Sequence, residues 1–255
     1  MSHRFHWLWI TLLAASAASA MPSLDIEITN DAGLDPKKLE SLTKDFQLWG
    51  QRVYAYLHEK PDGPIKVVFS KNAGPGFYVG DRIMIAPDDD EMLETWIHEL
   101  THHVTGHDST FFFKEGVATH AVEALYAPEH RVPQGWPNYG QSCDAWVSLF
   151  LARDQMPSLH EAMARDHYKG FPPWEDFRSW QIYCVGASFI SWQIRTQGLD
   201  AFRKTFDAQS LGDHEADLEK RWLDSVRAQK IAPFDAGNYL PASLRYTYYR
   251  HALSP

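Results

Sequence analysis

The sequence H-E-L-T-H at residues 98–102 constrains this chain more than any other feature. Residues four apart on an α-helix lie about 40° apart around its axis, so His98 and His102 present their imidazoles on one face, one turn apart. A tetrahedral zinc ion requires ligands in this arrangement. Glu99 lies one step round the helix, where it can act as a general base on a zinc-bound water. The segment therefore predicts a zinc site on a helix.

The residues on both sides of this motif are typical of helix ends. Pro87 is followed by four acids, among which Asp88 can cap the helix and Glu91 lies three positions further on. These acids also complement the positive end of the helix dipole. Gly106 is a typical helix stop. We therefore expect the motif to lie inside a short, capped helix.

Two histidines bind zinc weakly, so a third ligand must come from a nearby element. The metzincin spacing requires Gly at 105 and His at 108, where the chain has Thr105 and Asp108, which excludes that class. His107 lies just beyond the expected end of the helix. Glu115 and His120 lie on the next helix, five residues and about 140° apart, so they cannot both face one ion. Glu115 is favoured, because the small residues after it would let its helix pack closely against the motif helix.

These motifs together resemble a known family. H-E-L-T-H followed by F-x-K-E-G-V-A at 112–118 is similar to the gluzincin metallopeptidases, in particular the peptidase-MA-like group. The segment 183–190, Y-C-V-G-A-S-F-I, looks like the Y-x-x-G-x-S-F-V helix of that group. The resemblance implies Glu115 as the third zinc ligand and Tyr183 as the candidate donor to the oxyanion. The G-x-M-E-N signature of the aminopeptidases is absent, so aminopeptidase activity is not inferred.

The hydrophobic periodicity predicts an α+β fold in which a small N-terminal sheet, with an edge strand over the motif helix, precedes a mostly helical subdomain. The resemblance makes this fold zincin-like. Apolar residues at helical spacing predict a helix over 35–57, and 110–126 should form a second one, ended by Pro128. The expected strands are 24–28, 65–69 and a hairpin or bent edge strand at 77–86. Further helices are expected at 143–153, 183–197, 199–208 and 214–228, followed by an extended tail from 233 to 255.

The first twenty residues have the pattern of a cleaved signal peptide, with Arg4 before an apolar run that ends in small residues. We expect residues 21–255 to be a single domain, with an α/β zinc-binding part at 21–127 and a helical part at 128–255. The protein would then be periplasmic or secreted, with no membrane span after signal removal. Its two cysteines, Cys143 and Cys184, could pair in an oxidising compartment or remain buried thiols.

The formal net charge of −9 and the scattered basic residues exclude an extended nucleic-acid interface. The motif, the resemblance and the signal pattern together predict an exported zinc metallohydrolase, most simply a peptidase with a peptide or protein substrate. The alternative is a zinc-stabilised binding or scaffold module without activity.

Aromatic side chains between 130 and 180 could form a recognition surface, cover the metal or fill a core. They are Trp136, Tyr139, Trp146, Tyr168, Phe171, Trp174 and Trp180.

Overall fold

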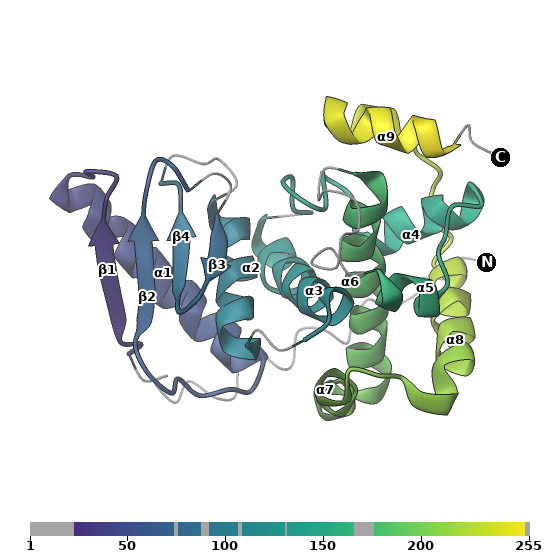
Figure 1. Cartoon of the computed structure of the whole chain (residues 1–255), viewed down its shortest axis with the longest axis horizontal. Coiled ribbons are helices and arrows are strands. Elements are labelled where there is room, and N and C mark those ends of the chain that lie inside the picture. The colour runs from purple at the N-terminus through teal and green to yellow at the C-terminus, as the bar shows by residue number, and fades with distance from the viewer. Residues whose placement is uncertain are drawn as a thin grey trace, which may run out of the picture.

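The structure is a computed structural model that describes residues 23–73, 76–87, 92–106, 109–130, 132–165 and 176–252. It confirms the α+β class: a small mixed sheet is followed by a larger helical body (Figure 1). The expected signal peptide at 1–20 and the expected capping residues Asp88 and Glu91 lie outside the described residues.

The four described strands pair in the order β1-β2-β4-β3. The first three in this order are parallel to one another, and β3 runs antiparallel to β4. The sequence-based expectation of a hairpin around Gly80 is therefore confirmed, and β3 is an edge strand. The bounds are β1, Ile26–Asn30; β2, Ile65–Phe69; β3, Phe77–Val79; and β4, Arg82–Ile85.

One face of the sheet is buried and the other is largely exposed. Ile65 and Ile83 belong to the buried set, whereas Lys66 and Arg82 alternate with them on the outer face. Helices α1 (Pro36–Tyr56) and α2 (Met92–Thr105) lie behind the sheet in Figure 1. The same alternation turns Tyr78 of β3 inward.

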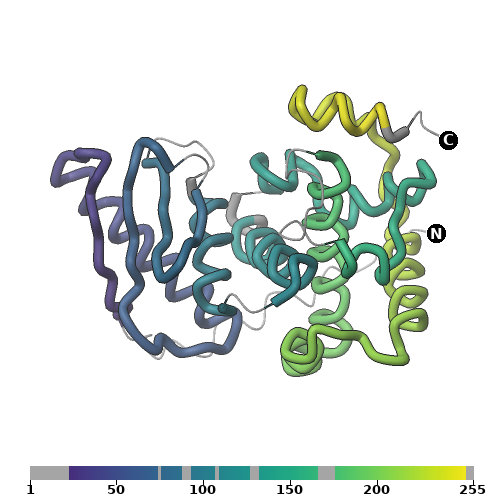
Figure 2. The backbone as a smooth tube through the Cα atoms, viewed as in Figure 1, coloured from purple at the N-terminus to yellow at the C-terminus, as the bar shows by residue number. Residues whose placement is uncertain are grey.

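Helix α2 lies between the sheet and α3 (Phe111–His130), and α3 packs in turn against the long helix α6 (Phe177–Gln197). The chain therefore runs from the sheet through α2 and α3 into a body of helices around α6 (Figure 2). The other elements of this body that the described residues form are α4 (Cys143–Ala152), α5 (Leu159–Ala164), α7 (Leu199–Ala208), α8 (Glu215–Ala228) and α9 (Ala242–Ala252), with 3-10 turns at η2 (Gly212–His214) and η3 (Ala236–Asn238).

Gly116, the first of the small residues after Glu115, makes its closest approach to α6. A Cβ on Gly116 would lie 2.8 Å from the carbonyl carbon of Gly186 in α6, and a Cβ on Gly186 would lie 2.8 Å from the carbonyl oxygen of Phe112. Helix α3 does pack against the motif helix α2 as expected, but Gly116 itself faces α6. The reason is geometric: neighbouring residues of a helix point about 100° apart, so Gly116 cannot share the direction of Glu115.

Two helix boundaries and the C-terminal tail also differ from the sequence-based expectation. Helix α3 continues past Pro128 to His130, because a proline removes one backbone hydrogen bond without always ending a helix. Helix α6 begins at Phe177, six residues early, where the side chain of Asp176 accepts the N–H of Arg178 and caps it. The tail is not extended: it contains α9, whose Leu244 and Tyr248 are buried four residues apart.

A buried polar cluster joins α3 to the start of α4. One Glu123 oxygen accepts the Asn138 side-chain N–H and the Cys143 backbone N–H, both at 2.6 Å. Cys143 and its neighbour Cys184 are fully buried free thiols, which agrees with the second of the two expected states. Desolvation, together with the nearby charge of Asp144, raises the pKa of Glu123 to about 7 against the hydrogen bonds that lower it.

This raised pKa predicts a pH dependence of stability. The folded state holds a proton on Glu123 between its ordinary pKa of 4.5 and about 7, while the unfolded state does not. The contribution of Glu123 to the free energy of unfolding should therefore fall as pH rises through this window and then level off. Denaturant unfolding at several pH values should show Glu123→Gln gaining stability relative to the wild type from pH 4.5 to 7. A constant difference would contradict the assignment.

Candidate metal centre

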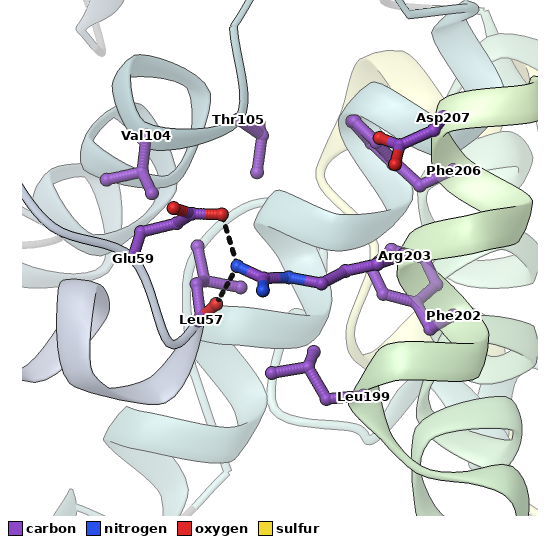
Figure 3. Close-up of a pocket in the computed structure, with 9 residues that line it drawn as sticks. All are labelled: Leu57, Glu59, Val104, Thr105, Leu199, Phe202, Arg203, Phe206 and Asp207. Carbon is purple, nitrogen blue, oxygen red and sulfur yellow. Dashed lines mark hydrogen bonds and ion pairs between the residues drawn. The ribbon is translucent and has the colours of Figure 1, made fainter.

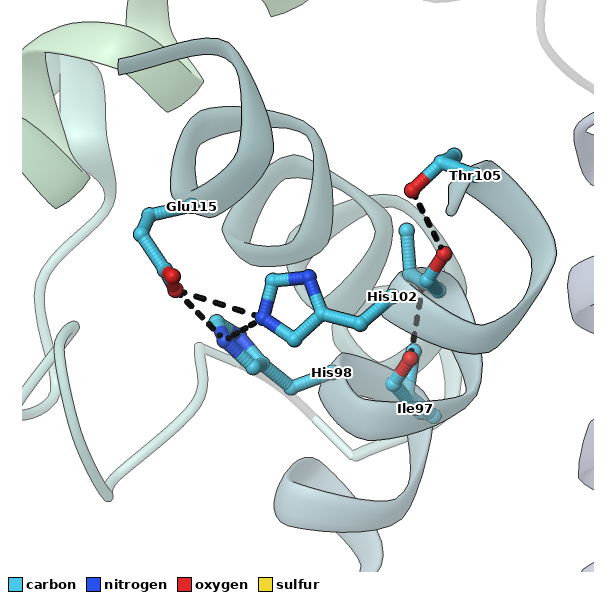
Figure 4. Close-up of polar contacts among 6 residues, drawn as sticks. Ile97, His98, His102, Thr105 and Glu115 are labelled. Atoms are coloured by element: carbon cyan, nitrogen blue, oxygen red, sulfur yellow. Dashed lines mark hydrogen bonds and ion pairs between the residues drawn. The ribbon is translucent and has the colours of Figure 1, made fainter. Parts of the chain in front are cut away.

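Helix α2 brings the two motif histidines together as expected. The Nε2 atoms of His98 and His102 lie 3.0 Å apart, and their rings meet edge to face with centroids 4.6 Å apart (Figure 4). His102 is 4% exposed, and Ile97 and Leu100 of the same helix are fully buried. This apolar face fixes the rotation of α2, so the histidines point toward α3.

Glu115 of α3 completes the group from the opposite side. Its Oε2 atom lies 3.1 Å from His98 Nε2 and 3.3 Å from His102 Nε2 (Figure 4). The ligand atoms of all three residues lie within 4.8 Å of one another, so the group could hold a metal ion. A zinc ion about 2.0–2.1 Å from each of three tetrahedral ligands requires ligand atoms about 3.3 Å apart, which these distances match.

The electrostatics of the group also suit a cation. Burial disfavours charge on His98, but the hydrogen bond to Glu115 and the charges of Glu99 and Glu115 raise the pKa of His98 above its ordinary value. Burial likewise opposes the charge of Glu115, yet His102 and His98 hold the pKa of Glu115 below its usual range. Two imidazole nitrogens and a carboxylate oxygen converge here, and a proton or a metal cation between them removes their mutual repulsion.

Glu99 lies beside this group without belonging to it. Its side chain is 7% exposed, and its charge acts on His98. Among the described residues, the group that could hold a metal consists of His98, His102 and Glu115, so the carboxylate of Glu99 remains available for another role.

The structure places Tyr183 of α6 against the group. Its ring stacks on His98 with centroids 6.3 Å apart and an angle of 28° between the planes. Phe111 and Trp136 each meet this ring edge-on, at 5.4 and 5.2 Å. The sequence-based reasoning therefore selected a residue that is adjacent to the candidate centre.

The remaining histidines that could have been ligands are placed elsewhere, or lie outside the described residues in the case of His107. His103 packs edge-on against Tyr78 of β3 at 5.6 Å. His120 Nε2 and the hydroxyl of Tyr56 share a hydrogen bond of 2.5 Å. Burial and the charge of Arg195 lower the pKa of His120 to about 4, so this imidazole is neutral at pH 7.

The aromatic side chains expected between 130 and 180 divide into two groups. Trp146 and Trp180 are completely buried in the helical body, whereas Trp136 and Tyr139 are only partly buried. Tyr168, Phe171 and Trp174 lie outside the described residues.

A separate pocket of about 230 Å³ lies where the end of α2 meets α7 (Figure 3). Leu57, Val104 and Phe202 are among its lining residues. Arg203 reaches across it to donate to the Leu57 carbonyl and to pair with Glu59. This arginine therefore connects α7 to the chain that follows α1.

One residue near the centre was missed in the sequence. Glu94 is 5% exposed, and its two carboxylate oxygens accept the backbone N–H groups of Gln134 and Gly135, each at 2.9 Å. Its position four residues before His98 would have placed it on the ligand face of the helix. No sequence signal indicated the distant backbone that it binds.

The chain was compared with protein-family models, curated proteins and solved structures, and none of the three searches finds a significant match. Within the described part of the chain, no helix has both the length and the apolar character needed to cross a membrane.

Proposed function

We propose that this protein is a zinc-dependent metallohydrolase of the gluzincin type that cleaves peptide bonds. The observation that carries the proposal is the convergence of His98, His102 and Glu115, with Glu99 buried beside them and outside the ligand set. Zinc, when bound by these three residues, supplies a Lewis acid that polarises a carbonyl and acidifies water.

Each nearby residue then has a distinct role. The carboxylate of Glu99 accepts a proton from the attacking water and can return it to the leaving amine. Tyr183, stacked on His98, offers its hydroxyl as a hydrogen-bond donor to the oxyanion that forms on the carbonyl oxygen. The low exposure of Glu99 and Glu115 limits competing water and strengthens these interactions.

The sheet offers a place for an extended substrate. Strand β3 is the edge strand and contacts α2, and its Phe77 and Val79 are 40% and 48% exposed. An extended peptide can add to such an edge strand by main-chain hydrogen bonds. A zincin-like fold, in which an edge strand borders the cleft above the motif helix, accounts for this arrangement.

The second candidate function is a zinc-stabilised binding or scaffold module. The observation that favours it is the aromatic cover of Tyr183 and Trp136 over the His98 side of the group. A structural zinc site is closed by a fourth protein ligand, whereas a catalytic site keeps a position open for water. Digestion of an unbiased peptide library by the purified chain, with and without a chelator, separates the two functions.

Metal content tests the ligand set directly. Purified wild-type protein should carry about one zinc per chain, and His98→Ala, His102→Ala and Glu115→Gln should each lose most of it, because two remaining ligands hold zinc weakly. His120→Ala should keep its zinc, since His120 bonds to Tyr56 instead. Elemental analysis after dialysis provides the measurement. Stoichiometric zinc in both histidine variants would refute the site, and zinc loss only in His120→Ala would move the third ligand.

A further inference from the structure

The loop over 132–141, which joins α3 to α4, is tied to the motif helix by a buried carboxylate. Glu94 accepts two backbone N–H groups of this loop, from Gln134 and Gly135. A buried carboxylate is costly unless its oxygens are satisfied, and charge-assisted bonds to backbone N–H groups are among the stronger hydrogen bonds. Because Glu94 and His98 are one turn apart on α2, the loop is fixed to the same helix that carries the candidate ligands.

The other half of the loop is held by the helical body. Trp180 donates its indole N–H to the Pro137 carbonyl at 2.8 Å, and Trp146 donates to the Asn138 carbonyl at 2.7 Å. The Asn138 side chain in turn donates to Glu123 at 2.6 Å. Side chains of α3, α4 and α6 therefore hold the loop at Pro137 and Asn138. In a simple connection between helices, these backbone groups would bond to water.

Trp136 lies between these two sets of anchors and stays partly exposed. Its ring meets Tyr183 edge-on at 5.2 Å, and Tyr183 stacks on His98 at 6.3 Å. Tyr139 packs edge-on against Trp136 at 6.0 Å. The rings of His98, Tyr183, Trp136 and Tyr139 thus form a continuous aromatic wall that joins a candidate metal ligand to the loop.

We propose that the loop 132–141 is a fixed substrate-recognition loop, in which Trp136 with Tyr183 contacts an apolar, preferably aromatic, side chain of the peptide. This inference rests on the proposed function. A tryptophan held in one orientation gives a large contact area with little loss of conformational freedom, which is why such residues dominate binding energies. Glu94 is a positioning residue that acts through the backbone of Gln134 and Gly135.

Peptide binding to zinc-loaded Glu99→Gln protein tests the inference without cleavage. The probes are two fluorescent hexapeptides, identical except for one central Phe or Ala. The Phe peptide should bind about tenfold or more tightly than the Ala peptide, because an apolar wall favours the larger apolar side chain. Adding Trp136→Ala should reduce this preference to about twofold or less, and Trp136→Phe should keep most of it.

A matched control is Tyr246→Ala, which removes an aromatic ring that is 70% exposed on α9 and should leave the preference unchanged. Absence of a Phe preference in the parent protein, or its survival in Trp136→Ala, would overturn the inference. Failure of the proposed function would instead appear in the zinc content and in the cleavage assay of the wild type, which are measured separately.

Glu94→Gln tests the positioning role. A glutamine has one acceptor oxygen where the carboxylate has two, so one of the two loop N–H groups loses its partner. The Phe preference should fall by at least about threefold, while zinc content and affinity for the Ala peptide stay unchanged. Equal weakening for both peptides would show that Glu94 supports the structure only and would refute its role in recognition.

Discussion

Replacing Glu99 with glutamine is expected to lower the turnover of any peptide that the wild-type protein cleaves by about 100-fold or more. Glutamine keeps the size, the helix propensity and most of the hydrogen-bonding shape of Glu99, but it cannot accept a proton from water. Because Glu99 lies outside the group that could hold a metal, zinc content and melting temperature should remain those of the wild type. Initial rates on the best library peptide, with zinc measured on the same sample, give the comparison.

Two outcomes would contradict this mechanism. Zinc loss in Glu99→Gln would make the residue a ligand, and full activity with full zinc would remove it as the general base. If the wild type cleaves nothing and the variant is equally stable, the scaffold function becomes the better explanation. His120→Ala is the control for a nearby buried change, because it alters a polar residue on α3 that bonds to Tyr56.

The second large effect is expected at the contact between α3 and α6. A valine at position 186 would place its Cβ 2.8 Å from the Phe112 carbonyl oxygen and 3.1 Å from the Cα of Gly116, both backbone atoms that cannot rotate away. The helices must therefore separate. Gly186→Val should lower the free energy of unfolding by about 3 kcal/mol or more, which corresponds to about 6–12 °C in melting temperature for a chain of this size.

Zinc affinity should fall in the same variant, because Glu115 directly precedes Gly116 and moves with it. Gly63→Val is the matched control, since a Cβ at Gly63 meets nothing within 4 Å. Thermal unfolding with excess chelator measures the packing effect alone, and competition with a zinc indicator measures the affinity. A melting temperature equal to that of Gly63→Val would show that the two helices are not in close contact.

The parts of the site that follow from local geometry were predictable from the sequence. The spacing of His98 and His102 within one helix determines their common face, and the distances in the structure agree with it. Glu115 needed a tertiary contact between two helices, for which the sequence offered only the small residues after Glu115 and the resemblance to a family. The loop contact of Glu94 could not be predicted, because it joins residues 40 and 41 positions apart through backbone atoms that carry no sequence signal.

In the fold, too, local patterns were predictable from the sequence and tertiary contacts were not. The helix over Pro36–Tyr56 has clear apolar periodicity, the strand over Ile65–Phe69 is a short β-branched run, and both lie where expected. Helix α9 was missed because tyrosines occupy both its buried and its exposed positions, so its apolar face has no contrast with its polar face. The approach of Gly116 to α6 could not be predicted, because a small residue indicates close packing without indicating which helix approaches.

The candidate ligands span only a short piece of chain, since His98 and Glu115 are 17 residues apart. The buried apolar core extends far beyond this segment on both sides, so the chain has a core that does not depend on a metal. A metal held here would add its binding free energy to the stability of the folded chain without being required for folding, in contrast to small domains that fold only around zinc. In the cell, the supply of zinc would then set how much of the protein is active, while its lifetime and abundance would depend on the packing of α3 against α6.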